Sequence, residues 1–160
     1  MSPGLLLDVR RLSDTLRSVR RPIVLEISEH DAIEDYAAFR RAAAAIGTDT
    51  RLAVDDAGAG YASFRHILEL RPDLVKLDVG LVRGVDTDHV RQALVAGIVY
   101  FSERSGCRLV AEGIERESER AILEQLGVHF GQGYLLPRPP FSPMRRCGIK
   151  PIAVAIDALG

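Results

Sequence analysis

This sequence has only two cysteines, no long hydrophobic run and no secretion signal, and each absence excludes a class of protein. The longest apolar stretch, residues 93–101, is interrupted by Gly97 and is about half the length that crosses a bilayer. Cys107 and Cys147 are not spaced as metal ligands, which favours a reducing compartment. Residues 1–8 lack the charged start and cleavage site of a signal peptide. We therefore expect a cytoplasmic protein without a membrane segment.

An excess of charge of either sign is also absent. The 160 residues carry 21 basic and 22 acidic side chains, for a net charge of −1, so we expect neither a nucleic-acid polymer nor an anionic membrane as partner. Lysine is scarce, because only two of the 21 basic residues are lysines. One of them, Lys76, lies inside an apolar run where this chain would ordinarily have arginine, which hints at a specific role.

The sequence does contain five short apolar runs that end in polar residues. These runs cover residues 23–26, 52–56, 74–78, 109–112 and 131–135. Segments with helical periodicity lie before and between them, at residues 6–19, 32–46, 61–70, 90–104 and 117–126. Such an alternation predicts right-handed βαβ units and a parallel sheet. The pattern ends at Pro140.

Several helix ends carry recognisable signals. Asp88 is expected to cap the N-terminus of the helix at 90–104, because a short carboxylate side chain can accept hydrogen bonds from the first free N–H groups. Gly47, Gly106 and Gly127 are expected to end the helices that precede them, since glycine readily adopts the left-handed conformation of a C-cap.

The polar residues at the ends of the apolar runs indicate an active site. Binding groups in parallel α/β sheets collect at the carboxyl ends of the strands. Four carboxylates, a lysine and an amide occupy those ends here: Glu26, Asp55, Asp56, Lys76, Glu112 and Gln132. A cluster of carboxylates of this kind requires a divalent metal to hold it together.

The adjacent acidic residues Asp55 and Asp56 form the strongest local signal, and they have two interpretations. Neighbouring strand residues point to opposite faces, so both can reach one site only where the strand frays into the loop. One carboxylate could then bridge two metals while the other binds one. Alternatively, Asp-Asp followed by Gly58 is ordinary turn chemistry.

The other polar residues also have structural alternatives. Glu26 and Glu112 each follow three apolar residues, where a carboxylate must be bound to metal or paired with an arginine. Lys76 and Asp78 are two residues apart and share a face, so they could serve a metal site or form a buried pair. Gln132, between two glycines, could position a water or be a loop residue.

Five ordered motifs resemble the successive signatures of the EAL domain. They are LEISE at 25–29, VDDAGAGYAS at 54–63, VKLD at 75–78, AEGIE at 111–115 and QGYL at 132–135. The EAL family comprises metal-dependent phosphodiesterases that convert cyclic di-GMP to linear pGpG. The resemblance covers roughly residues 2–139. It implies an α/β fold, an incomplete TIM-type (β/α) barrel with about five of eight strands present.

The resemblance also implies a role for each matching residue. The implied ligands of a two-metal Mg²⁺ or Mn²⁺ centre are Glu26, Asp55, Asp56 and Glu112, with Asp55 as the bridging ligand. Lys76 would activate the attacking water with support from Gln132. Glu115 would anchor the loop that follows Asp56, while Asp78 and Arg138 would contact cyclic di-GMP.

The sequence departs from the family in two places. The Glu-Ala-Leu signature is absent, and Ser2-Pro3 fits the pair that follows a second ligand, so we expect residues 1–140 to be a partial EAL domain and 141–160 a tail. Ala57 and Ala59 replace an aromatic and a hydroxyl residue, which weakens the expected link between this loop and dimerisation.

Three interpretations remain open from the sequence. The first is a cyclic di-GMP phosphodiesterase domain that is weak or inactive in this form, because two metal ligands are missing. The second is a degenerate EAL module that binds cyclic di-GMP or a protein partner without hydrolysis. The third is a fragment without activity. An open sheet with exposed edges would in each case favour a homodimer or association with another chain.

Overall fold

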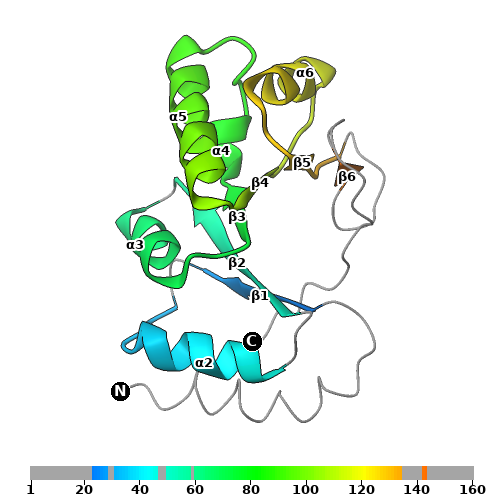
Figure 1. The fold of residues 1–160 in the computed structure, drawn as a ribbon. Coiled ribbons are helices and arrows are strands. Elements are labelled where there is room, and N and C mark those ends of the chain that lie inside the picture. Colours follow the sequence, from blue (N-terminus) through cyan, green and yellow to red (C-terminus); the bar gives the residue numbers. More distant parts are fainter. Residues whose placement is uncertain (1–22, 29–30, 47–49, 59, 135–141, 144–160) are drawn as a thin grey trace.

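The computed structural model describes residues 23–28, 31–46, 50–58, 60–134 and 142–143. One six-stranded sheet runs through this part of the chain, and the strands lie side by side in chain order (Figure 1). Its strands are β1 (Ile23–Ile27), β2 (Thr50–Ala57), β3 (Leu74–Leu77), β4 (Arg108–Ala111), β5 (Phe130–Gly131) and β6 (Ser142–Pro143). β1 to β5 are parallel and β6 pairs antiparallel with β5. The five predicted strands and their parallel arrangement are therefore confirmed.

The helices connect successive strands. They are α2 (Tyr36–Ile46), α3 (Tyr61–Leu70), α4 (Val79–Val82), α5 (His89–Ser105) and α6 (Glu117–Leu126). Because the strand order follows the chain order, right-handed crossovers place the connecting helices on one face of the sheet. In Figure 1, α2, α3 and α5 follow one another along the outside of the sheet. Within the described residues, no helix is long and apolar enough to span a membrane.

The predicted helix-end signals agree with the structure wherever it describes them. The Asp88 side chain accepts hydrogen bonds from two N–H groups in the first turn of α5. Gly106 and Gly127 follow α5 and α6 in the left-handed conformation, with φ of 79° and 97°. Gly47 and the helix expected at 6–19 lie outside the described residues.

One predicted helix begins later than expected. α2 starts at Tyr36 rather than at Ala32, because the Asp35 side chain accepts a hydrogen bond from the Ala38 N–H at 2.8 Å and thereby caps the first turn. The Asp31 carboxylate, which precedes the predicted start, instead accepts hydrogen bonds from Ser28. Polar residues at several consecutive positions made the choice of cap ambiguous in the sequence.

Two short elements had no sequence signal. α4 has four residues, too few to show a helical period. Asp78 caps it by accepting a hydrogen bond from the Gly80 N–H at 2.7 Å. β6 lies beyond Pro140, where the sequence pattern predicted no element, and its two residues are too few for strand alternation.

Buried side chains lie on both faces of the sheet. The larger cluster joins the sheet to the helices and includes Phe39 of α2, Ile67 of α3, Val95 of α5 and Leu123 of α6. A smaller cluster takes one apolar residue from each parallel strand: Val24, Ala53, Leu74, Val110 and Phe130. Since each of these strands contributes to the small cluster, it forms an apolar layer across the sheet.

Candidate metal centre

The predicted site residues lie directly above this apolar layer. In each parallel strand, or directly after it, the predicted site residue comes two positions after the strand's residue in the apolar layer. Residues two apart share a face of the sheet. The residues placed in this way are Glu26, Asp55, Lys76, Glu112 and Gln132. The sheet therefore brings side chains from five strands or strand ends together at its carboxyl end, as the sequence predicted.

Lys76 lies at the centre of the site. Its side chain is 7% exposed, and its Nζ lies 2.8 Å from Glu112 Oε1, 3.1 Å from Asp55 Oδ1 and 3.3 Å from Glu26 Oε2. Burial opposes the charge on this ammonium, but the hydrogen bond to Glu112 and the three carboxylates outweigh burial and raise the pKa of Lys76. Glu26 and Glu112 thus pair with this lysine. The alternative interpretation of the sequence, in which each glutamate pairs with an arginine, is not what the structure shows for these two residues.

Glu112 receives a second contact from Gln132. The Gln132 Nε2 donates a hydrogen bond to Glu112 Oε1 at 2.6 Å. Burial raises the pKa of Glu112, while the hydrogen bond and the charge of Lys76 act in the opposite direction. Gly133 allows this arrangement, because a Cβ there would lie 2.2 Å from the carbonyl oxygen of Ile114. Only glycine permits so close an approach of the two backbones.

A β-bulge turns Asp55 and Asp56 toward the same site. The pairing of β2 with β3 shifts between Val54 and Ala57, so β2 contains one residue more than β3 over this stretch. Asp56 has φ of 53°, a left-handed conformation that Asp tolerates, and its N–H donates to Asp55 Oδ1 at 3.0 Å. The prediction that the strand frays here was wrong, because β2 continues to Ala57.

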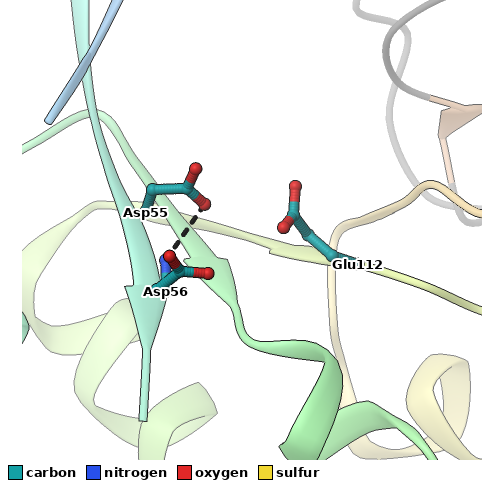
Figure 2. Close-up of side chains that lie close together, drawn as sticks. All are labelled: Asp55, Asp56 and Glu112. Atoms are coloured by element: carbon teal, nitrogen blue, oxygen red, sulfur yellow. Dashed lines mark hydrogen bonds between the residues drawn. The ribbon is translucent and has the colours of Figure 1, made fainter. Parts of the chain in front are cut away.

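Three carboxylates form a candidate cation site. One oxygen from each of Asp55, Asp56 and Glu112 lies within 4.8 Å of the others. Figure 2 shows Glu112 facing the two aspartates across the end of the sheet. Oxygen ligands of this type suit Mg²⁺ or Mn²⁺. The single ammonium of Lys76 offsets only part of the negative charge of the carboxylates around it, so the remaining charge of the site fits a divalent cation.

The remaining predicted residues lie at the edge of the site or outside the described chain. Asp78 caps α4, and it is not among the ion-pair partners of Lys76 within the described residues. Glu115 pairs with Arg83, the residue that follows α4. No local pattern in the sequence predicts this contact, because the two residues are distant in the chain. Arg138 lies outside the described residues.

Comparison with known proteins identifies the family. The sequence profile of the EAL domain matches residues 1–139. The chain belongs to the EAL domain family. The motifs that suggested this family in the sequence are the segments that deliver Glu26, Asp55, Lys76 and Glu112 to the carboxyl end of the sheet.

Curated EAL relatives cover most of this chain. The probable cyclic di-GMP phosphodiesterase PdeD of Escherichia coli strain K12 is 36% identical over 123 residues, which are 77% of this chain and 23% of that protein. The cyclic di-GMP phosphodiesterase PdeL of the same strain is 36% identical over 87 residues, which are 54% of this chain and 24% of that protein. The chain thus spans about a quarter of the length of these relatives.

Solved EAL structures share the fold. A complex of Klebsiella pneumoniae BlrP1 with manganese and cyclic di-GMP superimposes with a TM-score of 0.68 at 34% identity, covering 82% of this chain and 34% of that one. The EAL domain of Mycobacterium smegmatis DcpA superimposes with a TM-score of 0.71 at 25% identity, covering 88% of this chain and 64% of that one. The predicted α/β fold of the TIM-type EAL barrel is confirmed.

Proposed function

We propose that this EAL domain is a metal-dependent phosphodiesterase that converts cyclic di-GMP to linear pGpG. The observation that carries the proposal is the gathering of Lys76 with carboxylates from β1, β2 and the end of β4. It is supported by the names of relatives such as PdeL and by the manganese and cyclic di-GMP complex of BlrP1. The free, buried Cys107 is compatible with a cytoplasmic location, which we also propose.

The metal ligands in this proposal are Asp55, Asp56, Glu112 and Glu26, with Asp55 as the bridging ligand of two Mg²⁺ or Mn²⁺ ions. A bound divalent ion lowers the pKa of a coordinated water and offsets the charge of the phosphodiester. Glu26 reaches the site through its pair with Lys76 at 3.3 Å. The carboxylates outnumber the single lysine, so the site retains negative charge for a cation to neutralise.

Lys76 and Gln132 act on the water and on Glu112 in this proposal. Because its pKa is raised, Lys76 stays protonated at neutral pH and can donate hydrogen bonds to a water or a phosphoryl oxygen. Both Lys76 and Gln132 donate to the same oxygen of Glu112, Oε1, and we propose that the other oxygen, Oε2, binds metal. Asp78 and Arg138 are proposed to contact cyclic di-GMP, and Glu115 to hold the loop after Asp56.

Hydrolysis of cyclic di-GMP by the purified chain tests the proposal. With Mn²⁺ present, we expect pGpG to form slowly, since the sequence predicts a weak form of the enzyme. We expect Lys76→Ala to lower this rate about 100-fold or more because a positioned proton donor is lost. The matched control is Arg120→Ala, since the ion-pair partners of Arg120, Glu117 and Glu124, both lie on α6. Chromatography of the nucleotide products measures the rate.

Two results would contradict the phosphodiesterase proposal. Binding of cyclic di-GMP without any turnover would favour the degenerate module. Turnover that persists in Lys76→Ala would remove Lys76 from the mechanism.

A further inference from the structure

We propose that Arg91 is a positioning residue for the metal centre and that it acts through α4 on the two segments that carry Asp56 and Glu112. The inference rests on the metal site proposed above. It concerns residues outside the carboxylate cluster, because Arg91 lies on α5 and makes its polar contacts with α4, with Arg83 and with Asp88.

α4 touches both ligand-bearing segments through its apolar side chains. A Cβ at Gly58, two residues after Asp56, would lie 2.5 Å from Leu81 Cδ1. A Cβ at Gly113, directly after Glu112, would lie 2.6 Å from Val79 Cγ2. Both glycines have positive φ, 113° and 69°. The side chains of α4 therefore press against backbone at each segment, and the position of α4 sets the separation of the two segments.

A helix of four residues does not hold its own position, since helices this short are unstable without tertiary contacts. At the N-terminus of α4, Asp78 accepts a hydrogen bond from the Gly80 N–H. The Arg91 Nη1 donates one hydrogen bond to the carbonyl oxygen of Gly80 within α4, and another at 2.9 Å to that of Arg83, which follows the C-terminus of α4. α4 is thus fixed at both ends by side chains.

Arg91 is itself held in place by its own helix. Its Nε donates to Asp88 Oδ2 at 3.0 Å, and Asp88 also caps the first turn of α5. One guanidinium therefore links the start of α5 to two carbonyl groups of the α4 segment. A lysine could not reproduce this geometry, because it lacks the planar array of N–H donors.

The first test measures Mn²⁺ binding to the full chain by isothermal titration calorimetry. We expect Arg91→Gln to weaken Mn²⁺ binding about tenfold, within the range seen when supporting partners of metal ligands are removed. The control is Arg120→Gln, which removes an arginine of α6 whose ion-pair partners, Glu117 and Glu124, both lie on α6. The denaturant midpoint of each variant establishes that it is folded. Equal affinities for Arg91→Gln and the wild type would overturn the inference, as would an equal loss in the control.

A double-mutant cycle tests whether Arg91 acts through α4. Leu81→Ala removes the side chain that contacts Gly58. If Arg91 works through this contact, the variant Arg91→Gln/Leu81→Ala should lose little more Mn²⁺ affinity than the weaker-binding single variant. Fully additive losses would show that the two residues act independently and would overturn the proposed route.

Hydrogen exchange of the metal-free chain separates this inference from the proposed function. The Leu81 N–H donates to the Asp78 carbonyl at 2.9 Å, and the Glu112 N–H donates to the Leu77 carbonyl at 3.3 Å. In Arg91→Gln, both amides should exchange faster, while amides of α6 keep their rates. If the wild type binds no Mn²⁺, the proposed function fails, yet faster exchange at these amides still supports the positioning role. Unchanged exchange there overturns it.

Discussion

Lys76 connects three carboxylates that would otherwise repel one another. Replacing it with Met removes the charge but keeps most of the length of the side chain. We expect Lys76→Met to lower the free energy of unfolding by about 3 kcal/mol, because three partly buried carboxylates lose their counter-ion. Mn²⁺ should restore more stability to Lys76→Met than it adds to the wild type, since the ion replaces the missing cation.

Denaturant titrations of Lys76→Met and the wild type, with and without Mn²⁺, measure both effects. Equal Mn²⁺ stabilisation of the two proteins would show that the lysine and the metal do not share the same carboxylates.

Gly133 supports the site through backbone packing. We expect Gly133→Ala to destabilise the chain by about 2 kcal/mol, because the added Cβ would meet the Ile114 carbonyl oxygen at 2.2 Å and separate the segments that pair Gln132 with Glu112. Gly97→Ala is the matched control. A Cβ at Gly97 meets no atom within 4 Å, and alanine in the middle of α5 should stabilise the helix by up to about 1 kcal/mol.

Thermal unfolding followed by circular dichroism compares the two glycine variants. A stable Gly133→Ala protein would mean that the β4 and β5 segments can move apart without cost.

Among the elements, α6 is joined to the segment after α4 by one buried carboxylate. Glu119 is 1% exposed and accepts hydrogen bonds from the N–H groups of Gly84, Glu115 and Arg116. Burial favours the neutral acid, but these hydrogen bonds and the Arg116 side chain outweigh it and lower the pKa of Glu119 from 4.5 to about 2. The folded state therefore binds a proton here less readily than the unfolded state.

This shift makes the link between α6 and the α4 segment sensitive to acid. Above pH 4.5 the carboxylate contributes its full stabilisation, and this contribution is lost as the pH falls from about 4.5 to about 2. We expect Glu119→Gln to be less stable than the wild type by about 2 kcal/mol at pH 7, and this difference should shrink across that acidic range. Urea titrations at several pH values measure it. A difference that does not change with pH would contradict the assignment.

The sequence predicted long helices, which show a hydrophobic period, better than elements that depend on tertiary contacts. α3 and α6 have the predicted bounds, and α5 extends the prediction by one residue at each end. α4 was missed because its four residues are stabilised by Asp78 and Arg91 rather than by a hydrophobic period. The bulge in β2 was also missed, since it is defined by the register between two strands and leaves no local pattern.

The candidate site was predictable because chain order translates into position in a parallel sheet. Five apolar runs with polar ends were enough to place Glu26, Lys76 and Glu112 at one edge. The detailed contacts were not predictable. That Lys76 pairs with three carboxylates rather than with Asp78, and that Arg83 pairs with Glu115, depends on side-chain positions across distant segments. The division of the chain at residue 140 and an association through sheet edges stay predictions.

At the scale of the whole molecule, each described strand from β2 to β6 pairs with the strand that comes before it in the chain. The described strands therefore leave the ribosome in the order in which they pair, and none of them has to insert between two earlier strands. Each addition closes a loop of moderate length, which keeps the entropic cost of every step similar. The charges of the site arrive as Glu26, Asp55, Lys76 and then Glu112. The ammonium is thus in place before β4 brings the last of these carboxylates, Glu112.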